Sequence, residues 1–351
     1  MPPVFLNAIG TATPPHDVHE RFLAHAPTLL RTERDRQLFV RMAERSGIAH
    51  RWSFLRGELS DRFYIPGRFP TTAERMARYR QDALPLAEAA LESLGERLGR
   101  DWRVGVTHLL LVSCTGFEAP GLDQRLIAHC GLDPSVERSV IGFMGCNAAF
   151  HALKLARHIV RSEPASRVLV LNLELCTLHF QETDSLAQAL CFMLFSDGCA
   201  ASLVSAEPRG VELERFSQVT LPDSMDLITW HIGDDGFDMG LSGQVPATIL
   251  SHLPEHLAAL LGQARQEEFP LWAVHPGGRS ILDAVQLSLG LRDAALAASR
   301  EVLHDFGNMS SATVMFVLAR MMEEAGQGRR GIGLGFGPGV GVESLLFREA
   351  A

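Results

Sequence analysis

A cysteine that follows a two-glycine turn is the residue whose surroundings point most directly to chemistry. Residues 142–150 read GFMGCNAAF, so the turn delivers Cys146 to the predicted start of a helix that runs to about Arg161. Polar residues recur along this helix at steps of three and four, opposite a broad apolar face, which is typical of an amphipathic helix. A thiol at a helix start lies near unpaired backbone N–H groups and the positive end of the helix dipole, and both favour thiolate. Cys146 is therefore a candidate nucleophile, although a cysteine taken at random is more often a small buried packing residue.

Three segments of the chain recur in the same order in its two halves. LLLVSCTG at 109–116 matches LWAVHPGG at 271–278, residues 122–132 match 281–291, and residues 145–157 match 307–320. We interpret this as an internal duplication rather than a chance likeness of two α/β segments. The duplication places Cys146 and Asn308 at corresponding helix starts and His275 at the end of a strand beside Asn308. Helix starts and carboxyl ends of strands are where α/β folds collect their reactive groups.

A cysteine, a histidine and an asparagine brought together in this way could transfer an acyl group. Histidine can take the thiol proton and leave a thiolate–imidazolium pair, and histidine and asparagine can both donate hydrogen bonds to a developing oxyanion. A cysteine nucleophile forms a thioester, which suits exchange with another thioester because the acyl group stays activated. Taken singly, His275 is an ordinary strand-end histidine and Asn308 is more often a helix cap. The interpretation depends on their joint placement.

The order of the predicted elements is that of an α/β protein. Strands alternate with helices in both halves, as βαβ units do. We predict strands at 4–12, 108–114, 167–176, 198–204 and 271–275 and two more within 331–347, and helices at 18–46, 72–98, 122–130, 146–161, 185–190, 280–289 and 307–322. The glycine-rich stretch GLGFGPGVG at 333–341 is not a dinucleotide fingerprint, because a strand follows it where that motif needs a helix.

Composition excludes several classes of protein. The chain has 351 residues, 46% of them hydrophobic, and a net charge of −9 without a basic block, so we expect no nucleic-acid partner. No apolar run approaches 18 residues and the N-terminus lacks a basic, then apolar, leader, so we expect a cytoplasmic protein without membrane insertion. The six cysteines form no CxxC pair, which predicts neither a disulfide framework nor a metal site.

Although the net charge of the chain is negative, the predicted helical segment 18–46 contains a group of arginines. These are Arg31, Arg34, Arg36, Arg41 and Arg45. They form either a solvated helix face or the rim of a site for an anionic, phosphorylated ligand.

Five motifs in this order resemble the type III polyketide synthases, the chalcone synthase family, in its shorter bacterial branch. They are GFMGCNAAF at 142–150, LFSDGCAA at 194–201, VHPGGRSILD at 274–283, GNMSSATV at 307–314 and GFGPGVGVE at 335–343. The resemblance covers nearly the whole chain. It implies a thiolase-type fold of two duplicated αβαβα halves in five layers, here expected at 1–205 and 206–351, and a homodimer.

The same resemblance implies a reaction and its residues. Cys146 would be loaded with a starter acyl group from a CoA thioester, with His275 as the partner of its thiolate. His275 and Asn308 would bind malonyl-CoA and stabilise the enolate formed by decarboxylation, and repeated extension would end in cyclisation to a pyrone, resorcinol, phloroglucinol or related product. No metal or redox cofactor is implied. The implied substrate-binding residues are Phe195, Phe237, Cys114, His179, Ile228 and Ser310, and the implied CoA-binding residues are Arg41, Arg45, Gly277, Gly278 and Ser280.

Several positions depart from the plant members of the family. Leu38 occupies the third of three basic CoA-binding positions, and Ile228 stands where chalcone synthase has glycine. Cys114 and His179 replace threonines of the plant pocket, and Ala119 stands where a methionine reaches across the dimer. These differences make naringenin chalcone a doubtful product without identifying another.

Three alternatives remain open at this point. A carrier-protein-dependent 3-oxoacyl synthase has the same fold, but its histidine typically stands in a His-Gln-Ala-Asn context where this chain has His275-Pro-Gly-Gly. A cysteine-dependent thioester hydrolase would release free acid. A non-catalytic CoA- or lipid-binding relative would have no need of the cysteine, histidine and asparagine together.

Overall fold

The structure is a computed structural model that describes residues 2–350 except 57–62, 66, 100 and 324–325. Its strands are β1 Phe5–Ala12, β2 His16–Asp17, β3 Trp52–Ser53, β4 His108–Ser113, β5 Glu137–Gly142, β6 Val168–Leu175, β7 Asp197–Ser205, β8 Val211–Thr220, β9 Ile228–Gly233, β10 Gly236–Leu241, β11 Leu271–Val274, β12 Arg330–Gly337 and β13 Gly341–Glu349. Its α-helices are α1 His19–Leu29, α2 Glu33–Glu44, α3 Thr72–Leu98, α4 Leu122–Cys130, α5 Ala148–Ser162, α6 Leu186–Leu194, α7 Val245–Leu261, α8 Arg279–Leu289, α9 Ala297–Phe306 and α10 Thr313–Met322.

Two arms of the main sheet repeat one strand order. The sheet runs β11-β12-β13-β8-β1-β7-β6-β4-β5, and β8 and β1 share only two residue pairs, Phe5 with Glu212 and Leu6 with Val211. In the N-terminal arm β4 is parallel to β6, while β6–β7 and β7–β1 are antiparallel. In the C-terminal arm β11 is parallel to β12, while β12–β13 and β13–β8 are antiparallel. The predicted duplication is therefore confirmed at the level of topology.

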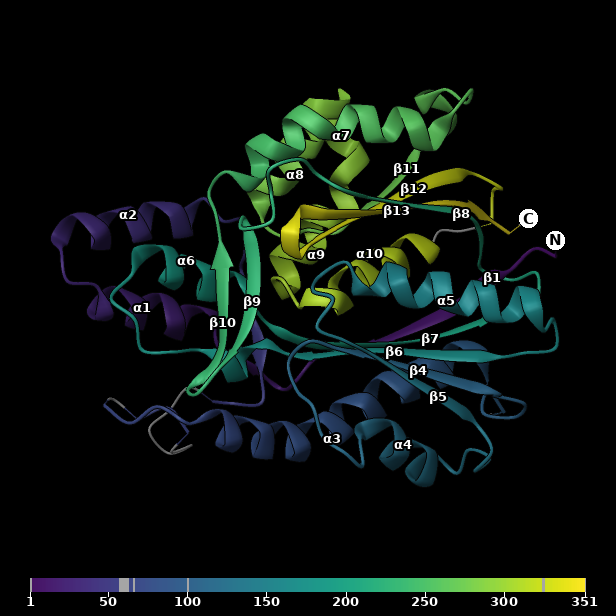
Figure 1. The fold of residues 1–351 in the computed structure, drawn as a ribbon, viewed down its shortest axis with the longest axis horizontal. Coiled ribbons are helices and arrows are strands. Elements are labelled where there is room, and N and C mark those ends of the chain that lie inside the picture. The colour runs from purple at the N-terminus through teal and green to yellow at the C-terminus, as the bar shows by residue number, and fades with distance from the viewer. Residues whose placement is uncertain (1, 57–62, 66, 100, 324–325, 351) are drawn as a thin grey trace.

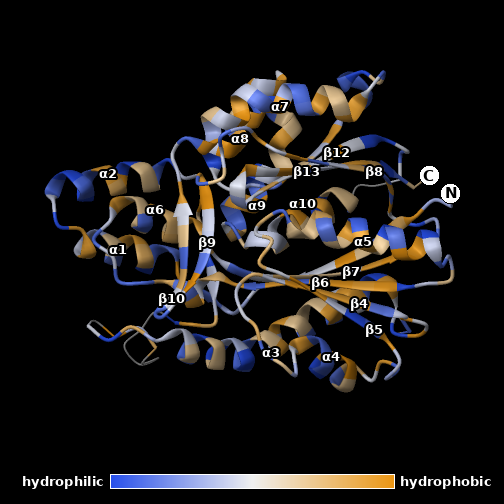
Figure 2. Cartoon of the chain, in the orientation of Figure 1, coloured by the Kyte–Doolittle hydropathy of each residue, from blue (hydrophilic) through white to orange (hydrophobic). Residues whose placement is uncertain are grey.

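The two arms and their helices stack in five layers (Figure 1). Helices α5 and α10 lie between the arms, α3 and α4 cover the outer face of the N-terminal arm, and α7 and α8 cover that of the C-terminal arm. Successive side chains of β6 point to opposite faces of the sheet, so this strand contributes to two hydrophobic cores. Val168 and Val170 pack in the central core between the arms, while Leu169 and Leu171 pack with α3. Strands buried on both faces read as continuous apolar runs, which is why these strands could be predicted from sequence (Figure 2).

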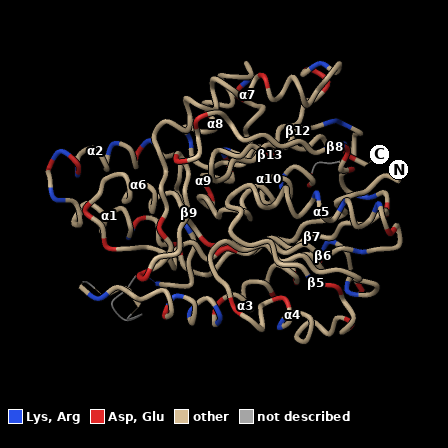
Figure 3. Tube along the Cα trace, viewed as in Figure 1, with Lys and Arg blue, Asp and Glu red and all other residues tan. Residues whose placement is uncertain are grey.

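A side layer outside the duplicated part covers one end of the arms. It consists of α1, α2 and α6, which share a small apolar cluster, and the hairpin β9–β10 (Figure 1). The segment 18–46, predicted as one helical stretch, forms two helices, because Thr32 caps α2 by accepting a hydrogen bond from the Asp35 backbone N–H. Charged residues of both signs are spread along outer helices and loops, including α2 (Figure 3).

No elements were predicted for residues 206–270, which precede the second set of matched segments. These residues contain β8, the hairpin β9–β10 and α7. The boundary predicted between residues 205 and 206 falls at the end of β7, before β8, and stays a prediction. No helix in the described part of the chain is long and apolar enough to cross a membrane.

Candidate active site

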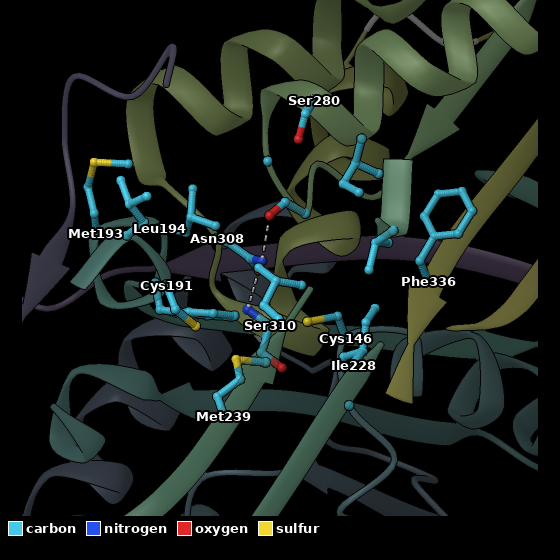
Figure 4. A pocket seen from close by; sticks show the side chains of 18 of the residues that line it. Cys146, Cys191, Met193, Leu194, Ile228, Met239, Ser280, Asn308, Ser310 and Phe336 are labelled. Atoms are coloured by element: carbon cyan, nitrogen blue, oxygen red, sulfur yellow. Dashed lines mark hydrogen bonds between the residues drawn. The ribbon is translucent and has the colours of Figure 1, made fainter. Parts of the chain in front are cut away.

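A cavity of about 890 Å³ lies where the turns before α5 and α10 meet the side layer. Cys146, His275 and Asn308 all line it. Figure 4 shows Cys146 and Asn308 at its wall. Nine other residues predicted from the sequence line it as well: Cys114, His179, Phe195, Ile228, Ser310, Arg45, Gly277, Gly278 and Ser280. The two halves of the chain thus contribute to one chamber.

The turn that carries Cys146 has a conformation that depends on glycine. Gly145 has φ +82°, and a Cβ there would stand 2.2 Å from Cδ of Pro338. Its N–H donates to Sγ of Cys114 over 3.1 Å. Cys146 does not occupy the first helical position as predicted, because Asn147, with φ −87° and ψ 1°, is the N-cap and α5 begins at Ala148. The cysteine sits in the turn itself, half-buried at the wall of the cavity.

His275 follows β11 directly, and its backbone N–H donates to the carbonyl of Leu334 over 2.8 Å. The side chain is fully buried, and neither ring nitrogen has a hydrogen-bond partner among the described residues. A buried imidazole without hydrogen-bond partners destabilises the folded state, so its ring nitrogens are suited to forming hydrogen bonds with a ligand.

Asn308 is fixed by bonds on both ends of its amide. Its Oδ1 accepts from the Ser310 backbone N–H at 2.9 Å (Figure 4). Its Nδ2 donates to the Gly277 carbonyl over 3.2 Å, and its Oδ1 also accepts from Oγ1 of Thr313 at 3.3 Å. Its backbone also forms a bridge with Phe195. Since Oδ1 can only accept, this network fixes the orientation of the amide and leaves its second N–H to face Cys146 or a ligand.

Burial disfavours the charged form of Cys146 and of His275, taken one at a time. It raises the pKa of Cys146 to about 11, although hydrogen bonds with Ser310 and Asn308 pull it down, and it lowers the pKa of His275 to about 3. A lone thiolate and a lone imidazolium are both disfavoured in the empty cavity. The two charges can form together, however, by transfer of the proton from Sγ to the ring.

A buried carboxyl group beneath the cysteine is a residue that the sequence analysis missed. Glu174, in β6, accepts hydrogen bonds from the Cys114 N–H at 2.9 Å, the Thr115 hydroxyl at 2.9 Å and the Ser311 hydroxyl at 2.6 Å. Burial nevertheless raises its pKa to about 7, and its charge raises that of Cys146. The available signal was a carboxylate inside a mainly apolar strand sequence, VLVLNLEL, because acidic residues are rarely fully buried unless they are paired.

One wall of the cavity is made by a histidine with no free nitrogen. Nε2 of His179 donates to the Thr115 carbonyl at 2.7 Å, and Nδ1 accepts from the Phe237 N–H at 3.2 Å. Its ring stacks on that of Phe237, with centroids 4.1 Å apart. Burial lowers its pKa to about 3, so His179 is a neutral aromatic wall. Phe237, predicted to bind substrate, lies behind this wall and is not among the residues that line the cavity.

The rest of the interior is mainly apolar. Ile228 and Met239 from the hairpin β9–β10, Leu194 from α6 and Phe336 from β12 converge there (Figure 4). Such a lining holds an apolar group by excluding water from it, with few polar groups to fix its orientation.

Two arginines stand at the edge of the cavity. Arg45, predicted from the sequence, lines it, and so does Arg279, the first residue of α8, whose Nη1 donates to the Arg45 carbonyl over 3.3 Å. Arg279 was missed although it directly follows Gly277-Gly278. Arg41 does not line the cavity; its Nε donates to the Gln37 carbonyl on its own helix. The described residues include no cluster of three or more histidine, cysteine or acidic side chains that could hold a metal ion.

Comparison with known proteins agrees with this geometry. Residues 2–208 match the family description "Chalcone and stilbene synthases, N-terminal domain", and residues 212–351 match the corresponding C-terminal domain. The alpha-pyrone synthesis polyketide synthase-like protein Pks18 of Mycobacterium tuberculosis is 33% identical over 358 residues, which cover 97% of this chain and 90% of that protein.

Solved structures of the same family superpose over almost the whole chain. The C-terminal type III polyketide synthase domain of Steely1 from Dictyostelium has a TM-score of 0.92 at 26% identity, covering 99% of this chain and 100% of that domain. The 1,3,6,8-tetrahydroxynaphthalene synthase of Streptomyces coelicolor A3(2) has a TM-score of 0.90 at 28% identity and covers 99% of each chain.

The chain therefore belongs to the chalcone and stilbene synthase family and has its thiolase-type fold. It is a type III polyketide synthase, an acyltransferase that depends on acyl-CoA and malonyl-CoA.

Proposed function

We propose that Cys146 carries the acyl chain while His275 and Asn308 activate the malonyl extender. The observation that carries this proposal is the meeting of the three side chains in one cavity, two of them from the second half of the chain. One group bears a nucleophilic sulfur, one can exchange a proton, and one is a fixed hydrogen-bond donor.

Loading begins when Sγ of Cys146 attacks the carbonyl of the starter acyl-CoA. His275 takes the thiol proton as the new C–S bond forms, and it returns a proton to the departing CoA sulfur as the old C–S bond breaks. The acyl group is then held on Cys146 as a thioester. The pKa shifts of both groups are consistent with a proton that moves only during reaction.

Extension uses the second pair of residues. Malonyl-CoA loses CO₂, and the electrons of the broken C–C bond form an enolate whose oxygen accepts hydrogen bonds from Nδ2 of Asn308 and a protonated ring nitrogen of His275. The enolate carbon attacks the acyl carbonyl and expels the Cys146 thiolate, so that the lengthened chain is now a CoA thioester and can be reloaded. Asn308 suits this role because its amide does not have to reorient.

The CoA portion would lie at the arginine edge of the cavity. Arg45 and Arg279 offer cations to the phosphates, and Gly277, Gly278 and Ser280 leave room for the pantetheine arm beside His275. Arg41 would act only at longer range. Arg279, rather than the position of Leu38, would then supply further positive charge.

The apolar lining favours an apolar starter group. The relative Pks18 carries alpha-pyrone synthesis in its name, so among pyrones, resorcinols and phloroglucinols we propose an α-pyrone as the product.

A second copy of the chain would cover the edge of the N-terminal arm, giving a homodimer. Strand β5 ends the sheet and, among the described residues, pairs only with β4; its residues from Glu137 to Val140 are exposed. Two apolar side chains beside it, Phe117 and Met144, are 40% and 41% exposed, and Val140 is 53% exposed. An exposed strand edge with apolar neighbours is suited to pairing with another chain. The cytoplasmic location expected from composition remains a prediction.

The test is an assay without any carrier protein. Purified enzyme is incubated with malonyl-CoA and a panel of aliphatic and aromatic starter CoAs, and products are measured by mass. We expect CO₂ release and products heavier than the starter by whole extension units. Strict dependence on a carrier protein would favour the 3-oxoacyl synthase, and free starter acid without a new carbon–carbon bond would favour the hydrolase.

The variant Cys146→Ala separates the two steps. We expect it to lose polyketide formation while it retains measurable decarboxylation of malonyl-CoA, because the enolate is stabilised by His275 and Asn308. Continued polyketide formation would show that another group carries the chain. Circular dichroism and thermal unfolding confirm that the variant is folded.

A further inference from the structure

A second cavity of about 350 Å³ lies beside the condensation cavity, in the side layer. Exposed residues of α1 and the segment before α6, namely Arg21, His25 and Glu182, border its mouth. The two cavities share Cys176, Phe192 and Phe195 among their lining residues. None of the residues to which we assigned reaction steps lines it.

The walls of this second cavity are aromatic. Phe180 contacts Phe22, Tyr64 and Phe192 with ring centroids 5.2 to 5.6 Å apart, in edge-to-face geometry. Rings in this arrangement offer both faces and edges to a flat or chain-like apolar ligand. A volume of this size is within the range of sites that hold small organic molecules.

A cation lies at the inner end of the cavity. Arg51 is only 3% exposed and lines the cavity. Its Nη1 donates to the carbonyls of Phe192 at 2.9 Å and Phe195 at 2.8 Å, and its Nε donates to Nδ1 of His19 at 3.0 Å. Its Nη2 is buried without a hydrogen-bond partner, and no carboxylate of the described residues is paired with the guanidinium.

Asp17 and Asp197 act on the charge of Arg51 through space and raise its pKa, but neither carboxylate is paired with the guanidinium. His19 accepts from Arg51 through a neutral nitrogen, and burial lowers the pKa of His19 to about 4. Asp17 accepts from the backbone N–H of Arg51 and pairs with His50. The ring of Phe22, 4.7 Å from Cζ, supplies a cation–π contact but no hydrogen-bond acceptor. A buried cation left in this state is costly, and a carboxylate is the group that matches a guanidinium best.

We propose that this cavity is a binding site for a free carboxylic acid with an apolar body, whose carboxylate pairs with Nη2 of Arg51 and whose body packs among the aromatic walls. An acyl chain extending from Cys146 through the shared wall would bring a neutral end to this cation, which is why we assign the site to a free acid. The inference concerns binding alone and does not depend on the reaction proposed for the other cavity.

Isothermal titration calorimetry of the full chain with cinnamate and with its neutral counterpart cinnamamide tests the proposal. We expect cinnamate to bind at least about tenfold more tightly than the amide, and Arg51→Gln to abolish that preference. Since the pKa of Arg51, although lowered by burial, is about 10, the preference should persist from pH 6 to pH 8. Equal affinity for the acid and the amide would overturn the proposal.

A second variant guards against misfolding of Arg51→Gln. Val18 lines the cavity, so Val18→Phe should fill it and remove cinnamate binding, whereas Val104→Phe, at a valine that is 71% exposed elsewhere, should not. Enzyme alkylated at Cys146 with iodoacetamide should still bind cinnamate. If alkylation removes binding, or if Val18→Phe leaves it intact, the acid binds in the condensation cavity and the proposal is wrong.

Discussion

The two arms of the sheet share their strand order but differ in where they place polar groups. The registers align Val112 of β4 with Asn172 of β6, and Val274 of β11 with Leu334 of β12. Because β4 corresponds to β11, the polar Asn172 and Glu174 of the N-terminal arm correspond to the apolar Leu334 and Phe336 of the C-terminal arm. At these matched positions, therefore, β6 holds buried polar groups where β12 is apolar, and the C-terminal arm carries its functional polar groups just beyond the strands, at His275 and Asn308.

The turns before α5 and α10 also differ in how their polar side chains are held. Asn308 is 2% exposed and its amide is held by three hydrogen bonds, whereas Cys146 is half-buried in a turn whose bonds are made by neighbouring residues. A duplicated scaffold can thus fix a hydrogen-bond donor in one copy and leave a nucleophile free to change partners in the other. Five substitutions test the site around these turns, from the largest expected effect to the smallest.

Asn308→Ala should cause the largest loss. Removing a fixed donor to an enolate oxygen lowers the rate of malonyl-CoA decarboxylation by about 10²- to 10³-fold. The rate of Cys146 alkylation by iodoacetamide should fall far less, because alkylation needs no oxyanion donor and loses only the hydrogen bond by which Asn308 lowers the pKa of the thiol. If both rates fall together, Asn308 acts on the cysteine and the division of labour between the two turns is wrong.

Glu174→Gln should change the dependence of stability on pH. The folded-state pKa of Glu174, about 7, is above its ordinary value of 4.5, so the folded state binds this proton more tightly than the unfolded chain does. Glu174 should therefore contribute a decline of up to about 3 kcal/mol in the free energy of unfolding as pH rises from 4.5 to 7, and the glutamine variant should lack that contribution while it keeps the one from Asp197, whose pKa is also raised to about 7. Urea unfolding at several pH values measures it.

Glu96→Gln, at an exposed position of α3, is the matched control and should leave the profile unchanged. Parallel profiles for wild type and Glu174→Gln would mean that the carboxylate is as well stabilised as in water, and that the polar groups of the N-terminal arm are not costly.

Gly145→Ala compares a crowded turn with an open one. Both Gly145, at φ +82°, and Gly131, at φ +63°, have left-handed backbone, but a Cβ at 145 meets Pro338 whereas nothing lies within 4 Å at 131. We expect Gly131→Ala to cost about 1 kcal/mol of unfolding free energy and Gly145→Ala about 1–3 kcal/mol more. Equal losses would show that Pro338 yields freely and does not shape the cysteine turn.

Arg45→Gln and Arg279→Gln should have the smallest effects. Both arginines are at the edge of the cavity, where solvent screens their charges, so we expect the KM for malonyl-CoA to rise about two- to fivefold with kcat nearly unchanged. Arg41→Gln is the control on α2 that does not line the cavity and should change the KM less. An effect of Arg41→Gln as large as that of Arg45→Gln would contradict the placement of the phosphates.

Much of the fold was predictable because it is encoded locally. The strands at 108–114 and 167–176 are continuous apolar runs, and the duplication is visible as three segments that recur in the same order along the chain. The segment that contains β8, β9, β10 and α7 was not predicted, because a hairpin that walls a cavity is specified by its contacts with other elements more than by its own pattern.

The candidate site, like the fold, was predictable from the sequence in part only. The sequence alone determined the reactive types, a cysteine after a glycine turn and its counterparts His275 and Asn308, because reactive groups and turn residues are chemical properties of single positions. Only the tertiary structure decided that Phe237 stands behind His179, that Arg279 joins Arg45, and that Glu174 and Arg51 are buried without full compensation. Burial, distance and hydrogen-bond satisfaction are properties of pairs of residues far apart in the chain, and they exist only once the chain has folded.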